Sequence, residues 1–286
     1  MRDEQFSRTA RGAALHRAAH QTLESGRIFR DPYACAILGL TPDEAVSEEG
    51  PDESRRRMRL FIAARSRFAE DRIAAAVARG VRQIVVLGAG LDTFGLRNPH
   101  VASGVRVFEV DHPATQEWKR ARIASMAVAA PSLTFAPCDF ERDDIGDALT
   151  RAGVDRGTPI FFMWLGVTPY LTPDAAMATL RAIAATPGAE VAFDYTQRRE
   201  RHEGEAREFH DRLLERVAAL GEPIVGFFDP RELARDLGQL GMTEQEDIDI
   251  SEIAARYFGA PRSSPPRASA AHLIWARRPQ ETGPAS

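Results

Sequence analysis

The sequence predicts an α/β fold in which a doubly wound, mostly parallel sheet of seven strands follows a helical N-terminal region. From Val81 onward, short runs rich in valine and phenylalanine alternate with helical stretches, a pattern typical of βαβ units. Before that point the sequence shows no strand alternation. The 286 residues suffice for one large domain or two small ones. We therefore expect a helical cap over residues 1–80 and a sheet domain over residues 81–286.

The cap is expected to contain three helices. Thr9–Leu23 is rich in alanine at helical spacing, and a short helix begins near Asp31 and Pro32. Thr41–Ser54 is acidic and contains two prolines and a glycine, which predicts a mobile loop. Arg55–Arg79 then forms a long helix, because its apolar residues recur every three or four positions.

Seven strands are expected in the sheet domain, the last two of them able to pair antiparallel. Their predicted ranges are Gln83–Leu87, Val105–Val110, Leu133–Ala136, Ile160–Leu165, Ala189–Tyr195, Met242–Ile250 and Ala271–Ala276. Between the fifth and sixth strands the sequence predicts two helices, Arg198–Leu220 and Asp229–Leu240. We expect residues 198–240 to form a lid over the crevice at the carboxyl ends of the strands, with Phe227 and Phe228 contacting a substrate.

Composition excludes several functions. The 37 basic and 41 acidic residues give a net charge of −4, so we expect no nucleic-acid partner. No apolar run approaches the roughly 18 residues that span a bilayer, and no hydrophobic signal segment begins the chain, so we expect a cytoplasmic protein without a membrane partner. Lys119, the single lysine, precedes Arg120, which excludes a P-loop. Cys35 and Cys138 are too few for a disulfide framework or a cysteine-rich zinc site, and no metal is expected.

The first strand runs directly into Gly88-Ala89-Gly90. Two glycines there allow a sharp turn and a close approach of a ligand to the backbone. Thr93 stands where a dinucleotide-binding motif has its third glycine. The pair of glycines is also compatible with a tight turn that binds nothing.

The next two strands also end in acidic residues. Glu109 and Asp111 lie on one side of the second strand, and either carboxylate could accept hydrogen bonds from both hydroxyls of a ribose. We favour Asp111 because it stands where the crevice opens, although it could instead cap the helix that begins at Pro113. Asp139 and Phe140 end the third strand, where a carboxylate can bind an adenine amino group and an aromatic ring can pack on the purine.

The fourth strand breaks at Gly166. Trp164 and Tyr170, on either side of this break, could shape an apolar pocket for a substrate. Tyr170 is a candidate for positioning that substrate, and no residue is assigned a catalytic role.

At this point the chain resembles a known family, the bacterial S-adenosyl-L-methionine-dependent methyltransferases related to leucine carboxyl methyltransferase. The resemblance covers nearly the whole chain, and four segments carry it: Arg65–Asp71, Val85–Thr93, Phe108–Pro113 and Gly166–Leu171. It implies the Rossmann-like, seven-stranded sheet of class I methyltransferases and S-adenosyl-L-methionine as the cofactor.

The resemblance also implies roles for individual residues. Arg65 would clamp the methionine carboxylate, residues 88–90 (Gly88, Ala89, Gly90) would line the methionyl and ribose part, Asp111 would bind the ribose, and Asp139 with Phe140 would contact the adenine. Many members carry glutamate where this chain has Leu165. That glutamate is expected to meet the cofactor's amino group, so backbone carbonyls near Gly88 and Leu165 must substitute or binding is weaker.

The expected reaction is O-methylation of a small-molecule carboxylate or hydroxyl by in-line displacement. Two alternatives stay open. An NAD(P)-dependent oxidoreductase is compatible with the glycine turn and Asp111, but it lacks the third glycine and has only Lys119 as a lysine. A catalytically idle cofactor-binding protein is compatible with the loss of the glutamate at position 165. No oligomeric state is predicted.

Overall fold

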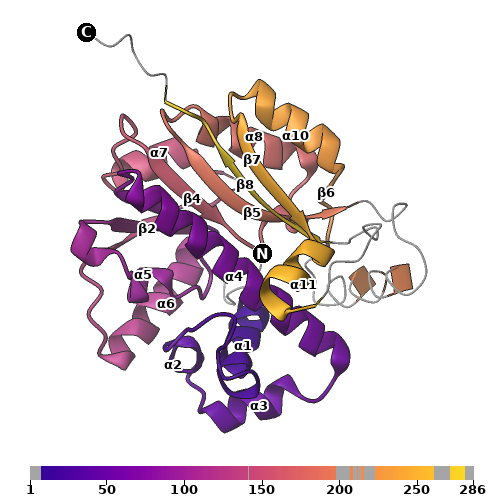
Figure 1. Ribbon diagram of the computed structural model, residues 1–286. Coiled ribbons are helices and arrows are strands. Elements are labelled where there is room, and N and C mark those ends of the chain that lie inside the picture. Colours follow the sequence, from indigo (N-terminus) through magenta and orange to yellow (C-terminus); the bar gives the residue numbers. More distant parts are fainter. Residues whose placement is uncertain are drawn as a thin grey trace.

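A mixed sheet forms the centre of the molecule (Figure 1). The computed structural model describes residues 8–140, 142–197, 207–208, 211, 214–215, 223–260 and 271–280. The sheet has the order β3-β2-β1-β4-β5-β8-β7, and the two-residue strand β6 pairs with the end of β5. The strands are β1 (Gln83–Leu87), β2 (Arg106–Asp111), β3 (Leu133–Pro137), β4 (Ile160–Trp164), β5 (Glu190–Gln197), β6 (Phe227–Phe228), β7 (Glu244–Asp249) and β8 (Ala271–Arg277).

Strands β1 to β5 are parallel, and β8 runs antiparallel to both of its neighbours, β5 and β7. The prediction that the last two long strands pair antiparallel is therefore confirmed. Strands β1 and β4 are buried at every residue, as their uninterrupted apolar sequences require of central strands covered on both faces. The strand order reverses between β1 and β4, so a crevice opens at their carboxyl ends.

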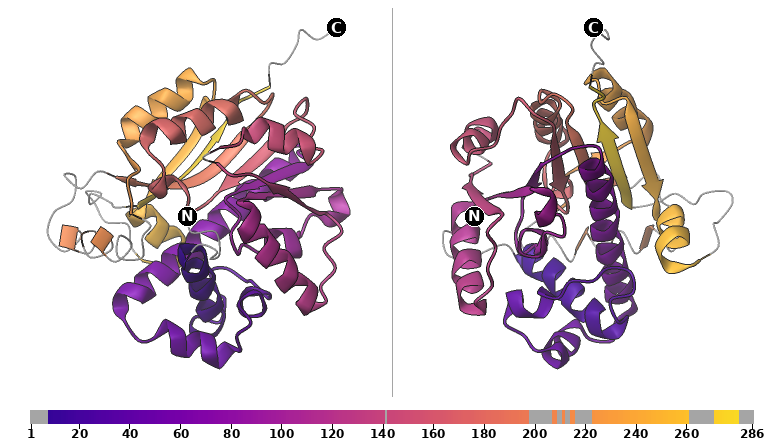
Figure 2. Two further views of the ribbon diagram at one scale, coloured as in Figure 1. Left: turned by 180° about the vertical axis from the view of Figure 1, so that it is seen from behind. Right: turned by 60° about the vertical axis from the view of Figure 1, so that its left-hand side comes forward.

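Helices cover both faces of the sheet (Figure 2). On one face α7 (Ile145–Arg151), α8 (Pro173–Ala184) and α10 (Pro230–Gln239) contribute to the core, and on the other α4 (Glu53–Ala78), α5 (Phe94–Arg97) and α11 (Ile250–Phe258) do so. Helix α6 (Pro113–Met126) packs against the cap. Among the described helices, none combines the length and the apolar character needed to cross a bilayer.

The cap consists of α1 (Arg8–Leu23), α2 (Ala34–Leu38) and α3 (Pro42–Glu49). Helices α2 and α3 pack against α1, and α1 lies against α4 (Figure 1). The expectation of a mobile loop over residues 41–54 is wrong. Thr41 accepts a hydrogen bond from the Glu44 N–H while the Glu44 carboxylate binds the Thr41 N–H, so a capping box starts α3. Pro42 occupies the first helical position, where a missing N–H costs nothing.

The predicted lid needs correction where the structure describes it. Residues 198–206, 209–210, 212–213 and 216–222 lie outside the described residues, and most of the expected helix Arg198–Leu220 falls among them. Helix α10, in contrast, buries Leu233 and Leu237 in the core of the sheet domain. Phe228 joins the same core, edge-on to Tyr195 at a ring distance of 6.1 Å. The segment 227–240 is thus part of the sheet domain's layers, and Phe228 is unavailable to a substrate.

Candidate functional site

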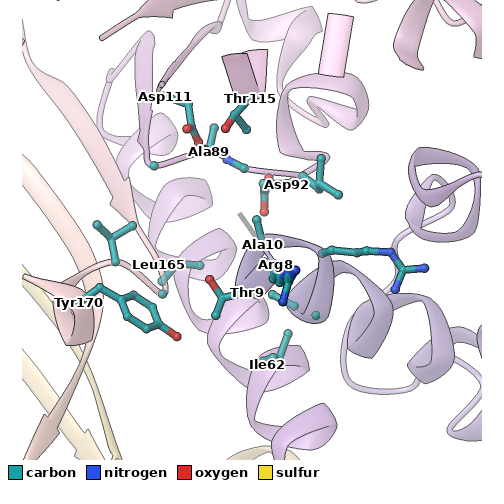
Figure 3. Close-up of a pocket in the computed structure, with 18 of the residues that line it drawn as sticks. Arg8, Thr9, Ala10, Ile62, Ala89, Asp92, Asp111, Thr115, Leu165 and Tyr170 are labelled. Carbon is teal, nitrogen blue, oxygen red and sulfur yellow. Dashed lines mark hydrogen bonds between the residues drawn. The ribbon is translucent and has the colours of Figure 1, made fainter. Parts of the chain in front are cut away.

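A cavity of about 1330 Å³ lies at the carboxyl ends of the central strands, between the sheet and the cap (Figure 3). Nine residues predicted from the sequence line it together: Arg65, Gly88, Ala89, Gly90, Asp111, Asp139, Phe140, Leu165 and Tyr170. The expected contribution of Trp164 to this pocket is wrong, because that side chain is 1% exposed and packs in the core. From the cap, Arg8, Thr9 and Ala10 face the sheet residues across the cavity (Figure 3).

The turn after β1 depends on its glycines. Gly88 has φ +62° and Gly90 has φ +47°, a region of backbone conformation that side chains disfavour. A Cβ on Gly88 would lie 2.5 Å from a methyl group of Val167, and one on Gly90 would lie 3.0 Å from the Cβ of Ala10. The turn therefore fits closely between the β4 loop and helix α1 of the cap.

Asp111 ends β2 beside this turn. Its Oδ2 accepts the Gly90 N–H at 2.5 Å and its Oδ1 accepts the His112 N–H at 2.7 Å. Burial raises the pKa of the Asp111 carboxyl, and these two N–H groups partly oppose that rise. The cap of α6 is His112, whose ring accepts the Ala114 N–H at 3.3 Å, so Asp111 is not the helix cap.

Glu109, the competing acid, is fully buried and does not belong to the described cavity lining. Its Oε2 lies 2.6 Å from the Lys119 Nζ, and its Oε1 has no hydrogen-bond partner among the described residues. Burial raises the pKa of Glu109 to about 7 although Lys119 opposes the rise. Of the two acids on β2, the geometry therefore leaves only Asp111 accessible to a ligand.

Arg65 reaches the other end of the crevice from α4. Its guanidinium lies 3.0 Å from Asp194 on β5, and a Cβ on Gly166 would meet it at 2.8 to 3.1 Å. The second oxygen of Asp194 accepts the Gly166 N–H at 2.6 Å. Asp194, which sequence reasoning missed, thus holds Arg65 and the Gly166 turn together. Its only signal in the sequence was an acid that follows the apolar run Val191–Phe193 within the strand.

At the third strand end, Asp139 and Phe140 line the cavity as predicted. The Asp139 N–H donates to Asp143 at 2.9 Å, which fixes the backbone of this loop. Phe140 keeps 39% of its surface exposed, more than almost every other large apolar residue described. An exposed ring in a cavity of this kind is suited to stacking on a flat ligand.

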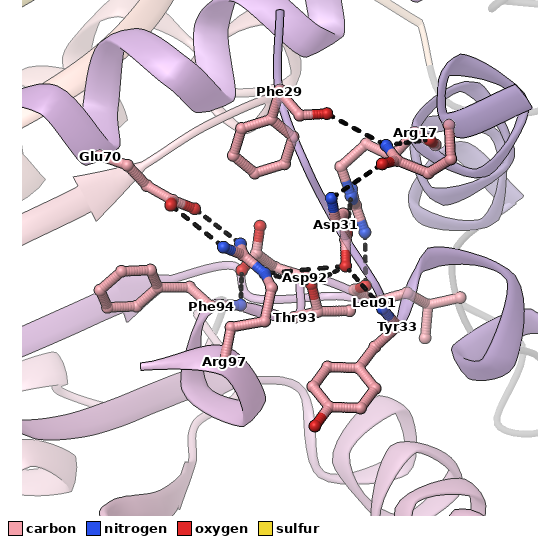
Figure 4. A network of polar contacts seen from close by, with 11 residues as sticks. Arg17, Phe29, Asp31, Tyr33, Glu70, Leu91, Asp92, Thr93, Phe94 and Arg97 are labelled. Atoms are coloured by element: carbon pink, nitrogen blue, oxygen red, sulfur yellow. Dashed lines mark hydrogen bonds and ion pairs between the residues drawn. The ribbon is translucent and has the colours of Figure 1, made fainter. Parts of the chain in front are cut away.

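A polar network joins the cap to the glycine turn (Figure 4). Arg17 of α1 donates to the Leu91 carbonyl at 2.6 Å and pairs with Asp31 at 3.1 Å. The Thr93 hydroxyl donates to the same Asp31 at 2.7 Å. Thr93 is fully buried, so the residue that replaces the third glycine of a dinucleotide motif anchors the cap instead.

Asp92 is a further lining residue that sequence reasoning missed (Figure 3). Burial alone would raise the pKa of its carboxyl. The charges of Arg17, Arg97 and Lys119, with the hydrogen bond from the Phe94 N–H, together outweigh burial and lower that pKa below its ordinary value. The cavity floor next to the glycine turn therefore carries a fixed negative charge.

Comparisons with known proteins agree with this geometry. The family model for leucine carboxyl methyltransferase matches residues 10–184. A Bacillus subtilis (strain 168) protein named "Putative S-adenosyl-L-methionine-dependent methyltransferase YktD" is 32% identical over 182 residues, 63% of this chain and 60% of that protein. A Mycobacterium avium (strain 104) protein with the same description is 38% identical over 198 residues, 64% of this chain and 63% of that protein. The aligned part thus spans less than two thirds of either relative.

Among solved structures, a Thermobifida fusca YX protein described as a methyltransferase superposes with a TM-score of 0.53. The superposition covers 97% of this chain and 96% of that protein at 19% sequence identity, which shows a shared fold. The family match includes most of α1, the glycine turn, Asp111 and the Gly166 turn, all of which contribute to the cavity lining. The chain belongs to the leucine carboxyl methyltransferase family.

Proposed function

We propose that this protein is an S-adenosyl-L-methionine-dependent methyltransferase that methylates an oxygen of a small molecule, a carboxylate or a hydroxyl. The observation that carries the proposal is the single cavity lining in which Arg65, the glycine turn, Asp111, Asp139 and Phe140 converge. The family membership supports it. The cytoplasmic location expected from the sequence is part of the same proposal.

The chemistry of the lining fits the cofactor group by group. A guanidinium at Arg65 suits the methionine carboxylate, and Asp111 suits the ribose hydroxyls. The backbone of the glycine turn lines the cavity where the sugar and sulfur part would lie, and Phe140 offers a ring to the adenine. The cavity of about 1330 Å³ exceeds the roughly 300–1,000 Å³ of common small-molecule sites, so an acceptor fits beside the cofactor.

The ammonium group of S-adenosyl-L-methionine is the one part of the cofactor for which this chain lacks the glutamate expected from the family. Leu165 lines the cavity where many relatives of this family carry glutamate. Asp194 places a carboxylate beside the neighbouring Gly166, 3.0 Å from Arg65. We propose that Asp194 supplies the negative charge of this region and that backbone carbonyls accept the ammonium hydrogens.

When bound, S-adenosylmethionine supplies a methyl group on a positively charged sulfur that an acceptor oxygen can displace in line. The protein then has to align the acceptor and exclude water. We propose that residues 1–80 act as a cap for this purpose on the sheet domain of residues 81–286. Ala10 lies against the Gly90 turn and Arg17 binds the Leu91 carbonyl, which would hold α1 closed over the site. Tyr170 is the lining residue we assign to acceptor positioning.

A labelled-methyl experiment tests this function. The protein is incubated with methyl-labelled S-adenosylmethionine and a metabolite extract, and products are identified by mass spectrometry. We expect at least one small molecule to gain the label on oxygen. Cofactor binding without any labelled product would favour the idle binding protein instead.

Arg65→Lys tests the carboxylate clamp. Lysine keeps the positive charge but cannot reproduce the planar, forked contact of a guanidinium, so we expect weaker S-adenosylmethionine binding. The control ligand is 5′-methylthioadenosine, which lacks the carboxylate and should bind the variant as it binds the wild type. An equal loss for both ligands would mean that Arg65 acts through the Asp194 contact and the fold.

A further inference from the structure

The cavity continues past the proposed cofactor residues along one face of α4. Arg55, Met58, Ile62 and Arg65 all line it, at intervals of three or four residues that place them on one side of the helix. In the close-up, Ile62 lies on the side of the cavity away from Asp111 (Figure 3). The ten residue steps from Arg55 to Arg65 correspond to about 15 Å of helix. An apolar stretch thus separates two cationic ends.

The far end of this stretch carries an unused donor. Arg55 donates from Nη2 to Glu49 at 2.9 Å, while its Nη1 bonds to no group in the described part of the chain. A ligand oxygen in the cavity would provide the missing acceptor.

His16 of α1 contacts the Glu49 carboxylate, to which Arg55 also donates. Its Nδ1 lies 2.9 Å from Glu49, which is fully buried. Burial by itself would raise the pKa of Glu49, but the contacts with His16, Arg59 and Arg55 lower it to about 2, so Glu49 is ionised and must accept. His16 therefore carries its hydrogen on Nδ1. Its Nε2 bonds to no group in the described part of the chain.

We propose that Arg55 and His16, the distal pole of the cavity, bind an acidic group of the methyl acceptor. This inference rests on the proposed function and names its substrate class: an elongated amphipathic carboxylic acid. Its carboxylate would lie at the distal pole, its apolar body along Met58 and Ile62, and the oxygen to be methylated near the cofactor.

One cation of the cavity lining has no counter-charge. Arg8, Arg11 and Arg55 line the cavity, and Arg11 pairs with Glu48 and Arg55 with Glu49, but Arg8 pairs with no carboxylate among the described residues. Asp52 is engaged at the start of α4, where it accepts the Ser54 N–H at 2.8 Å. The lining also includes the apolar residues Leu171 and Val225.

A bound carboxylate should also draw a proton onto His16. Burial, with the charges of Arg55 and Arg59, lowers the pKa of His16 despite Glu49, so the free imidazole is neutral at pH 7. The groups that face it are Glu49 from α3 and these two arginines from α4. An anion beside Nε2 stabilises the imidazolium. Affinity should therefore rise as the pH falls through the neutral range.

Calorimetry with octanoate as the probe tests this pole. The wild-type protein is first saturated with S-adenosylhomocysteine, then titrated with acetate, octanoate or 1-octanol. We expect octanoate to bind at least about tenfold more tightly than either of the others, and more tightly at about pH 6 than at about pH 8. His16→Gln should remove the pH dependence.

Arg55→Lys keeps a charge beside Glu49 but removes the Nη1 donor, and we expect it to weaken octanoate binding at least about tenfold. Arg56→Gln is the matched control, because that neighbouring arginine is 47% exposed and pairs with Glu53. Failure of octanoate to bind, or equal binding by wild type and Arg55→Lys, overturns the inference. If S-adenosylhomocysteine does not bind in the first step, the proposed function is overturned instead. Titration of octanoate into the protein without S-adenosylhomocysteine then still tests whether the distal pole binds a carboxylate.

Discussion

Replacing Lys119 with methionine is expected to lower the free energy of unfolding by about 3–5 kcal/mol, because it leaves the Glu109 carboxylate buried without its counter-charge. Lys119 and Glu109 are each 1% exposed or less, and their charged atoms lie 2.6 Å apart. Methionine preserves the apolar stem of the side chain, so the loss reports the charge. Chemical denaturation at neutral pH measures it.

The effect should depend on pH. Burial raises the pKa of Glu109 from 4.5 to about 7 in the folded protein. A group whose pKa is raised by folding stabilises the protein below its unfolded pKa and loses that contribution as the pH rises through the folded value. Without Lys119 the folded pKa rises further. The variant should therefore lose more stability at about pH 8 than at about pH 5.

The double variant Lys119→Met with Glu109→Gln is the control, since it removes both charges and should recover much of the lost stability. A Lys119→Met penalty that stays constant between these pH values would show that the pair contributes through packing alone.

Asp111→Ala is expected to weaken S-adenosylmethionine binding about ten- to hundredfold, or roughly 1.5–3 kcal/mol, by removing the acceptor of the ribose hydroxyls. The methionine carboxylate plays no part in this contact, so 5′-methylthioadenosine should lose affinity to the same extent. That pattern is the reverse of the one expected for Arg65→Lys. Calorimetry with both ligands measures it.

The matched control is Glu109→Gln, on the same strand but outside the cavity lining, which should leave cofactor affinity unchanged. Unchanged affinity in Asp111→Ala would contradict the ribose assignment.

The sheet was largely predictable from the sequence because its central strands are buried on both faces. Gln83–Leu87 ends at the glycine turn in both the prediction and the structure, since an apolar run followed by glycine marks its own boundary. Helix α3 was missed because its proline and glycine indicated a loop, although Thr41 and Glu44 have the spacing of a capping box.

Some residues of the candidate site could be predicted from the sequence and others could not. Residues that follow a strand, such as Asp111 and Asp139, were predictable because parallel strands bring their carboxyl ends to one edge. Asp194 and His16 were not, because their roles depend on which distant side chain they meet: Arg65 for one and Glu49 for the other. No local pattern encodes such long-range contacts.

Isothermal titration of the wild-type protein with S-adenosylmethionine and, separately, with NAD tests most directly whether this cavity is a methyl-donor site. We expect saturable binding of one S-adenosylmethionine per chain, weakened by Asp111→Ala, and no binding of NAD. Binding of NAD with no binding of S-adenosylmethionine would contradict the proposed function and favour the oxidoreductase.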